Sequence, residues 1–373
     1  MMDVSYHIVL QMTNLDGKRL YKDDWKQIDE TEFHAYINLL ILAGVYKSHG
    51  EATNSLWNTE NGRPIFFSVM SLDNFQRISR IIRFDDLHAE KVWTLYNAKT
   101  SYAWSMQIYT GKRSSLILEK NQVMPVMLHL TAGLKENNVT CDNFFTSHEL
   151  AMQLLKTIKK NKPELPQEVL ELRGRAVHSS KFEFTEQCTV VSYIPKKHRM
   201  VLVRSTMQKD ASLSTGEGCK PEMILDHDAT KGGVDNMDKM LASYTCQRMT
   251  DRWPPVIFYI IDVSANNGYL LWTNCNPEWN VRKMYRRRLY LEEVGKALKV
   301  QREEQGTSQS TVQATSNKKR SRCQLCDVAD NKTSTRRPIL VSIACFAQTN
   351  SSYIHQFENK NQRHITYFIN KQH

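Results

Sequence analysis

This sequence of 373 residues lacks the cysteine spacing of a disulfide framework and the features of a secretion signal. Its eight cysteines are scattered, and among them Cys323 and Cys326 stand close together. That distribution favours reduced thiols in the cytosol or nucleus. The start, "MMDVSYHIVLQM", has no basic segment, long apolar core or small-residue cleavage site, so we expect no signal peptide. Internal repeats are also absent.

Uninterrupted apolar runs are scarce. The run "WPPVIFYIIDVSANNGYLLW", residues 253–272, has the residue count of a membrane span. Asp262, Asn266 and Asn267 interrupt it, and its paired prolines suit the first turn of a helix. We therefore expect a buried core helix here and no membrane partner.

Positive charge is in excess, since lysine plus arginine number 50 and aspartate plus glutamate 39, a net charge of +11. This balance favours polyanions, with nucleic acid first and an anionic membrane second. Lysines that merely aid solubility are the alternative. A basic cluster follows residue 280 and is a candidate for contacts with DNA phosphates, the alternative being the charged end of a core helix: Arg282, Lys283, Arg286, Arg287 and Arg288.

Residues 1–86 have a helical pattern. "DETE", residues 29–32, has the spacing of a capping box, and apolar residues follow it at helical intervals. A second helix is predicted over about 72–83, with Ser71 as its cap. Both are expected to be core helices.

Strand patterns begin near residue 91. "KVWTLY", "SYAWSMQIY", "VMPVMLHL" and "NNVTCDNFF" are predicted strands, and "TSHELAMQLLKTIKK" is a predicted helix. Asp142 thus falls at the end of a strand, before a strand-to-helix turn, where α/β sheets favour ligand sites. "KFEF", "CTVVSYI" and "RMVLVRS" predict a β insertion over about 165–220.

Two further acids follow paired glycines in "TKGGVDNMDKMLASY", which predicts a tight turn that opens a helix. Asp235 and Asp238 would share one helix face. Together with Asp142, Asp235 is a candidate ligand for Mg²⁺, which prefers hard oxygen ligands in phosphoryl-transfer sites. Acids that only complement a helix dipole are the alternative.

The motifs "VTCDNFFTS", "TKGGVDNMD", "RMTDRWPPVIFYIIDVSANN" and "NAKTSYAWSMQIYTGK" closely resemble the piggyBac family of DNA transposases and their domesticated derivatives, over about residues 12–290. The resemblance implies an α/β fold with an RNase H-like (retroviral integrase-like) core. It implies three aspartates that bind Mg²⁺ or Mn²⁺, cutting at transposon ends, joining to TTAA targets, a nuclear location and a homodimer. By motif, Asp142 matches the second catalytic aspartate and Asp235 the third. Asp238 matches a nearby acid, and Trp253 matches the "RWP" tryptophan, a candidate DNA contact.

The first catalytic aspartate of the family has no counterpart in this sequence. It opens a "DE" motif between "RFDD" and "KVW", but here "RFDD" runs through "LHAE" straight into "KVW", so several dozen family residues are missing. The family's "DAKTSY" also reads "NAKTSY", with Asn97 in place of an acid. Asp85 and Asp86 are not expected to substitute. We predict that Asp142 and Asp235 hold metal weakly and that cut-and-paste transposition fails.

The missing segment also carries a strand. In RNase H-like folds the first strand lies mid-sheet, beside the strand of "NNVTCDNFF". Its loss predicts a gap in the ladder, at about 1–3 kcal/mol for each buried unpaired backbone group. Total stabilities are about 5–15 kcal/mol, so we expect an incomplete core.

The chain after residue 275 is predicted to consist of a linker, a cysteine-rich segment and a tail. Residues 276–322 are an expected basic, disordered linker, and "KKRSR" within it is a candidate nuclear localisation signal. Residues 323–348 resemble a degenerate cysteine-rich zinc domain, in which Cys323, Cys326 and Cys345 form either a weak zinc site or unpaired thiols. Residues 349–373 match nothing in the family.

The expected organisation is therefore a helical region over 1–86 and an incomplete core over 87–275, followed by linker, zinc remnant and tail. The expected function is that of a piggyBac-derived, DNA-binding protein without transposase activity. Three alternatives stay open: a domesticated DNA-binding protein, the product of a dead element, and an active transposase whose predicted gene dropped a coding segment.

Overall fold

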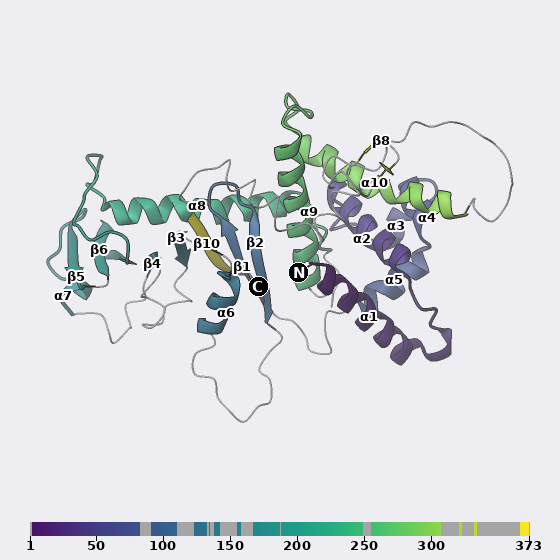
Figure 1. Ribbon diagram of the computed structural model, residues 1–373, viewed down its shortest axis with the longest axis horizontal. Helices are drawn as coiled ribbons and strands as arrows, with labels where there is room; N and C mark the ends of the chain where they lie inside the picture. Colours follow the sequence, from purple (N-terminus) through teal and green to yellow (C-terminus); the bar gives the residue numbers. More distant parts are fainter. Residues whose placement is uncertain are drawn as a thin grey trace. The chain divides into compact units, whose positions relative to one another are not determined.

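The computed structural model describes residues 2–82, 91–109, 123–132, 134, 138–141, 155–157, 167–186, 188–248, 255–306, 321–322, 332–333 and 366–372. The architecture is mixed α/β (Figure 1). The chain divides into two compact units. Unit 1 comprises Met1–Glu90 and Met240–Phe357, and unit 2 comprises Lys91–Lys239 and Glu358–His373. This division differs from the expected core over 87–275, because the helix predicted near residue 253 belongs to unit 1.

Unit 1 is helical. Its elements are α1 (Met2–Tyr21), η1 (Lys22–Asp24), α2 (Glu30–Val45), α3 (Thr53–Leu56), α4 (Pro64–Val69), α5 (Leu72–Ile81), α9 (Pro255–Cys275) and α10 (Arg286–Gly306), with a short strand pair, β8 (Ser321–Arg322) and β9 (Lys332–Thr333). The two predicted caps are confirmed. The Asp29 carboxylate accepts from the Glu32 N–H at 2.7 Å, and the Ser71 hydroxyl accepts from the Asn74 N–H at 3.3 Å.

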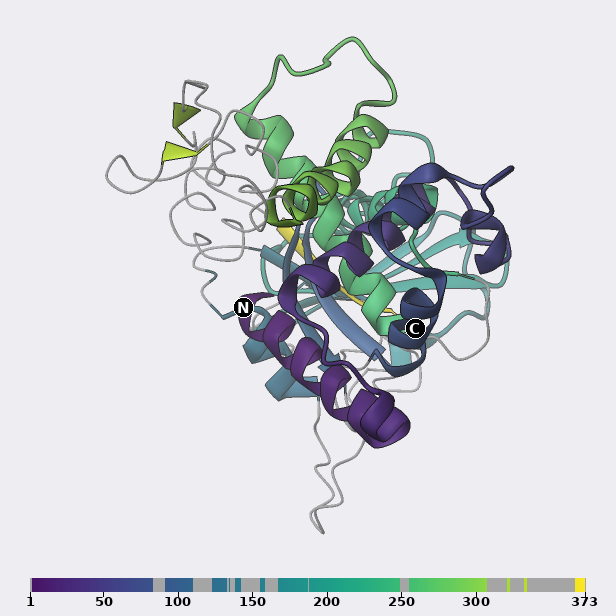
Figure 2. The same ribbon diagram turned by 90° about the vertical axis from the view of Figure 1, so that its right-hand side faces the viewer.

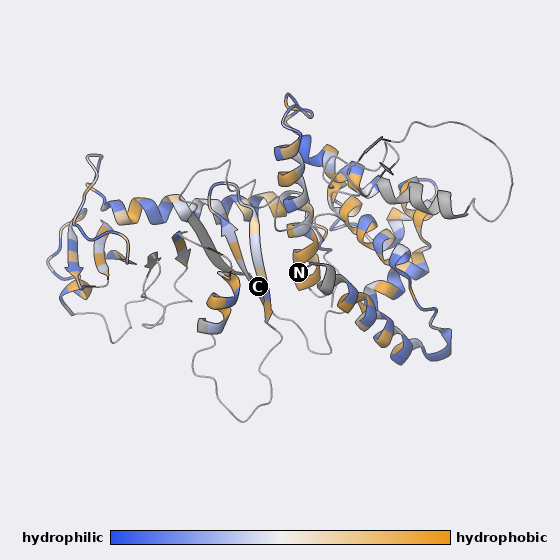
Figure 3. Ribbon diagram, in the orientation of Figure 1, coloured by the Kyte–Doolittle hydropathy of each residue, from blue (hydrophilic) through white to orange (hydrophobic). Residues whose placement is uncertain are grey.

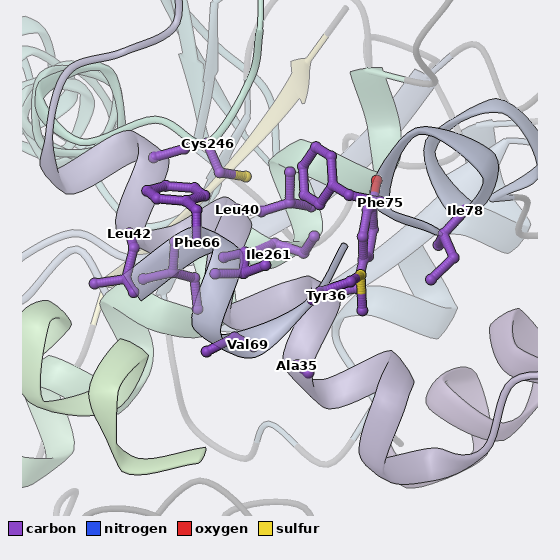
Figure 4. Packing of buried hydrophobic residues seen from close by; sticks show 14 of the residues in the cluster. Ala35, Tyr36, Leu40, Leu42, Phe66, Val69, Phe75, Ile78, Cys246 and Ile261 are labelled. Atoms are coloured by element: carbon purple, nitrogen blue, oxygen red, sulfur yellow. The ribbon is translucent and has the colours of Figure 1, made fainter. Parts of the chain in front are cut away.

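The core of unit 1 combines aliphatic side chains with packed aromatic rings (Figure 4). Tyr36 of α2 lies 5.0 Å from Phe75 of α5, centroid to centroid, and its hydroxyl meets the Ser79 hydroxyl at 3.2 Å. Phe66 of α4 contacts the Trp57 ring edge-on at 5.0 Å. These aromatic rings bury large apolar areas, and this packing joins α2, α4 and α5 into one cluster.

Helix α9 completes this core, as its apolar sequence predicted. Ile257, Phe258 and Ile261 are buried in the same cluster. Figure 3 shows hydrophilic residues mixed with hydrophobic ones along α9. Among the helices described, none is long and apolar enough to cross a membrane.

The expectation of a disordered linker over 276–322 is wrong for α10. Tyr290, Leu291 and Val294 recur at helical spacing and are buried against unit 1. The Asn38 side-chain amide of α2 donates to the Val294 carbonyl at 3.0 Å. Burial of these three side chains outweighs the basic, polar composition of the segment. Residues 307–320, the centre of the expected linker, lie outside the described residues.

Unit 2 is built on an eight-stranded sheet in the order β2-β1-β10-β3-β4-β7-β6-β5 (Figures 1 and 2). The strands are β1 (Lys91–Asn97), β2 (Ala103–Tyr109), β3 (Asn138–Cys141), β4 (Leu155–Thr157), β5 (Ser180–Phe184), β6 (Thr189–Lys196), β7 (Arg199–Ser205) and β10 (Thr366–Gln372). Its helices are α6 (Val123–Leu130), α7 (Gln167–Leu170) and α8 (Glu222–Ser243), of which α8 continues into unit 1. Strands β5, β6 and β7 pair as an antiparallel meander, which confirms the three strands predicted for the insertion.

Three local predictions in unit 2 are wrong. "VMPVMLHL" forms helix α6, because Val126, Met127 and Leu130 fall on one helical face and pack on β1. Leu155–Thr157, predicted as helix, form β4, which pairs with β3 and β7; the rest of that predicted helix lies outside the described residues. The paired glycines 232 and 233 lie inside α8 and do not open it.

The predicted gap in the sheet is also wrong, because the C-terminal strand β10 fills it. β10, yellow in Figures 1 and 2, runs antiparallel to β1, from Val92↔Gln372 to Asn97↔Tyr367. It runs parallel to β3, from Thr366↔Asn138 to Ile369↔Cys141. The tail that matches nothing in the family thus supplies the mid-sheet strand. Its first residues, "TYFI", are β-branched or aromatic types that favour strands.

Candidate functional site

The two described acids of the candidate site lie on α8. Asp235 and Asp238 are exposed, while Met237 between them is fully buried. Their three-residue spacing places both carboxylates near one another on the helix surface. The pattern of α8 therefore fixes which way this motif faces: Met237 anchors the helix and the acids remain accessible.

Close packing against the β1–β2 turn positions this part of α8. A Cβ atom on Gly233 would lie 2.3 Å from the Ala98 carbonyl oxygen, so the helix approaches the turn as only glycine allows. The Ser101 hydroxyl donates to the Gly233 carbonyl at 2.9 Å. The "NAKTS" and "GGVD" motifs, more than a hundred residues apart in sequence, are thus brought together.

Asn97, where the family has an acid, closes this turn. Its side-chain carbonyl accepts from the Lys99 N–H at 3.0 Å and from the Thr100 N–H at 2.9 Å. The side chain is buried, and the backbone N–H donates to the Tyr102 carbonyl at 2.8 Å. An Asx turn of this kind needs a side-chain oxygen but not a charge, so asparagine keeps the turn while removing a carboxylate.

The third part of the site is the paired ends of β3 and β10. Their register runs to Ile369↔Cys141, and Asp142 follows Cys141 in sequence but lies outside the described residues. β10 reads "TYFINKQ" and contains neither aspartate nor glutamate. Within the described ranges, no group of three or more His, Cys, Asp or Glu side chains is arranged to hold a metal.

The described residues by themselves do not make up a two-metal centre. Such a centre uses several carboxylates to hold two cations against their mutual repulsion. Of the predicted ligands, the described part of the chain contributes Asp235, with Asp238 one turn away. Trp253 and the three candidate zinc ligands, Cys323, Cys326 and Cys345, also fall outside it.

The basic segment after residue 280 separates into exposed and internally bonded cations. Arg282 and Lys283 are exposed, beside a fully exposed Met284. Arg288 forms an ion pair with Glu292 one turn along α10, at 2.8 Å. Arg286 is half-buried and donates to the Pro277 carbonyl at 3.2 Å.

Arg287 is directed into unit 1. Its guanidinium donates to the Met240 carbonyl and lies over the Tyr244 ring, 5.5 Å from the centroid. Burial lowers the Arg287 pKa, and the nearby Asp262 opposes that decrease. Arg282 and Lys283 are therefore the members of the cluster best placed to meet a phosphate.

Asp262 is a buried acid close enough to Arg287 to affect its pKa. In the sequence it stands out only because it interrupts an apolar run. Burial raises the pKa of Asp262 to about 6, against a usual value of 3.8, although hydrogen bonds limit the rise. The Thr245 hydroxyl donates to one carboxylate oxygen at 2.7 Å, and the Cys246 N–H donates to the other at 2.9 Å. These bonds tie α9 to the segment that follows α8.

The fold of this chain is similar to that of a transposase of known structure. A cryo-EM structure of a piggyBac transposase synaptic complex with hairpin DNA superimposes with a TM-score of 0.65, at 22% sequence identity, covering 87% of this chain and 88% of that one. The sequence itself matches the Transposase IS4 family over residues 5–91 and 87–269, two segments that meet at the "LHAEK" junction. The resemblance of the motifs to piggyBac-type transposases is thereby confirmed, and the chain belongs to the Transposase IS4 family.

Proposed function

We propose that this chain is a DNA-binding relative of piggyBac transposases with an RNase H-like core and without cut-and-paste activity. The observation that carries the proposal is β10. It takes the mid-sheet position beside β3 that the resemblance assigns to the strand bearing the first catalytic aspartate, yet it contains no carboxylate. The sheet is complete, while the acid is missing.

The chemistry of metal-assisted strand transfer explains why one acid matters. Mg²⁺ or Mn²⁺ would have Asp142 and Asp235 as ligands, with Asp238 nearby, and when bound would supply Lewis-acid stabilisation of phosphate oxygens. Two ligand carboxylates offset less positive charge than three and fix fewer coordination positions. Alignment of the attacking and leaving oxygens is then lost, which is costly because small misplacements reduce rates about a hundredfold.

An excision assay tests the loss of activity. The full chain is incubated with a TTAA-flanked transposon and either Mg²⁺ or Mn²⁺, beside an Asp142→Ala variant and an intact piggyBac transposase as positive control. We expect the chain and the variant to give the same background, far below the positive control. Excision by the chain above the Asp142→Ala background overturns this part of the proposal.

DNA binding is supported by separate observations. The net charge is +11, and Arg282 and Lys283 are exposed together in unit 1. The piggyBac transposase of similar fold was solved in a complex with DNA. By resemblance we propose transposon-end DNA and TTAA sites as ligands, a homodimer as the binding form and the nucleus as location, for which "KKRSR" is the candidate signal. By the same resemblance we propose that Cys323, Cys326 and Cys345 bind zinc weakly.

Charge-reversal variants distinguish a direct contact between DNA and Arg282 and Lys283 from an effect of the protein's net charge. The double variant Arg282→Glu/Lys283→Glu is compared with Lys196→Glu/Lys197→Glu, an exposed pair at the β6–β7 turn with the same change in net charge. If the first pair neutralises two phosphates, its loss lowers the slope of log affinity against log salt by roughly two, since each contact contributes about 0.9. Equal slopes for both variants would refute a contact at Arg282 and Lys283.

One observation favours a second candidate, an active transposase whose predicted gene dropped a coding segment. The family match breaks into two segments at residues 87–91, the junction at which the "DE" motif is missing. Sequencing the transcript across codons 84–97 decides between them. A transcript that contains the missing segment supports the active enzyme, and one that reads directly through "LHAEKVW" supports the proposal above.

A further inference from the structure

The most unusual feature of unit 2 is the origin of its central strand. β10 comes from the last residues of the chain, yet its two sheet neighbours, β1 and β3, end at Asn97 and Cys141. More than two hundred residues separate β10 from either neighbour. The place in the sheet between β1 and β3 is called here the β1–β3 slot. It is filled by β10, a segment distant from both strands in sequence.

The slot presents strand-pairing groups on both sides. β1 pairs with β10 along Val92–Asn97, and these six residues are all buried. β3 pairs with β10 along Asn138–Cys141, of which Val139, Thr140 and Cys141 are buried. Without an occupant, both strands would expose rows of backbone N–H and C=O groups inside a buried region, which is strongly unfavourable.

We propose that the β1–β3 slot is a strand-binding site and that its occupant is the chain's own C-terminal segment, Thr366–Gln372. Backbone pairing on two sides at once holds the segment, the mode by which extended peptides add to sheets. Covalent attachment raises the local concentration of the strand. The same slot accepts a peptide of this sequence in trans when the attached strand cannot pair.

A cross-link in the full-length chain tests both the occupant and the register. In the variant Ile369→Cys, the introduced thiol is in register with the native Cys141. Neighbouring strands lie about 4.8 Å apart, within the Cα separation that a disulfide bridges. The control is Phe368→Cys, which is in register with Thr140 and one residue out of register with Cys141, since successive positions of a strand alternate between its two faces.

We expect mild oxidation to link position 369 to Cys141, detected by mass mapping, and the Phe368→Cys control to give little of this link. Mixing isotopically heavy and light chains identifies the source of the strand. Links within one chain support the proposal. Heavy–light links show that a second copy fills the slot and overturn it, as does equal linking by both variants or none by either.

A second variant probes the site itself. In Ile369→Pro the strand loses a backbone N–H and cannot complete both ladders. We expect amide exchange of Val92–Asn97 and Asn138–Cys141 to become much faster, and added peptide of residues 364–373 to restore their protection. Unchanged protection in this variant, or failure of the peptide to restore lost protection, overturns the proposal. Peptide bearing the same proline is the matched control.

Discussion

Replacement of Gly233 by alanine tests whether α8 is positioned by its close approach to the β1–β2 turn. Its neighbour Gly232 is the matched control, since an added Cβ there meets no atom within 4 Å. Both glycines lie inside the same helix, so both gain the same helix propensity on replacement. The difference between the two variants therefore isolates the contact.

The structure gives the magnitude. Alanine in place of glycine inside a helix contributes about 1 kcal/mol, so Gly232→Ala should stabilise unit 2 by roughly that amount. At position 233 the new methyl group would lie 2.3 Å from the Ala98 carbonyl oxygen and 2.7 Å from its Cα. Both are backbone atoms that cannot rotate away, and overpacking of this kind costs about 1–3 kcal/mol. Because the propensity gain is the same in both variants, we expect Gly233→Ala to be less stable than Gly232→Ala by about 1–3 kcal/mol.

Urea unfolding of the two full-length variants measures the difference, and amide exchange locates it, because a chain of two units need not unfold in one step. In Gly233→Ala the Ser101 hydroxyl bond to residue 233 should also be lost, so the amides of Asn97 and Ser101 should exchange faster. Equal stability of the two variants, with turn amides equally protected, would contradict a steric contact between residue 233 and Ala98.

Burial raises the pKa of Asp262 to about 6 from 3.8, so between these pH values the folded state binds more protons than the unfolded state. The stability that this proton binding contributes is fully present below pH 3.8 and is lost as the pH rises through 6. At about 1.4 kcal/mol for each pH unit, wild type should lose roughly 3 kcal/mol of unfolding free energy between pH 3.5 and 7 that Asp262→Asn does not lose. Denaturant titrations at both pH values measure this; parallel pH profiles would contradict it. Phe66→Ala removes a fully buried ring that contacts Trp57 and should cost about 3–5 kcal/mol, whereas Phe67→Ala, 45% exposed, should change stability by less than about 1 kcal/mol. Equal unfolding midpoints for these two variants would contradict the packing of α4.

Helical periodicity and helix caps could be predicted from the sequence because both depend on residues that lie close together in the chain. Asp29 and Ser71 sit one residue before their helices, and each accepts a hydrogen bond from an N–H three residues on. The strands β5, β6 and β7 are joined by short turns and pair in chain order, so each strand's neighbour in sequence is also its neighbour in the sheet. Likewise, the "GGVDNMD" motif located Asp235 and Asp238 correctly on a helix.

Other predictions failed where partners far apart in sequence decide the outcome. "VMPVMLHL" suits either a strand or a helix by composition, and the apolar face of β1 selects the helix α6. The basic, polar segment 286–306 appears unstructured by composition, until unit 1 offers a place to bury Tyr290 and Leu291. A short stretch of sequence does not show whether a distant part of the chain will bury its few apolar side chains.

The sequence alone pointed to the family, through motifs whose order and spacing do not depend on folding, and it predicts that the family's first catalytic aspartate has no counterpart in this chain. That β10 fills the place between β1 and β3 became known from strand pairing in the folded chain. Strand pairing uses backbone N–H and C=O groups that every residue except proline carries, so the side chains of "TYFINKQ" do not identify β1 and β3 as its partners. Backbone pairing lets the distant C-terminal segment take a place between β1 and β3 whatever its side chains are, whereas a particular carboxylate has to be present in the sequence of the strand.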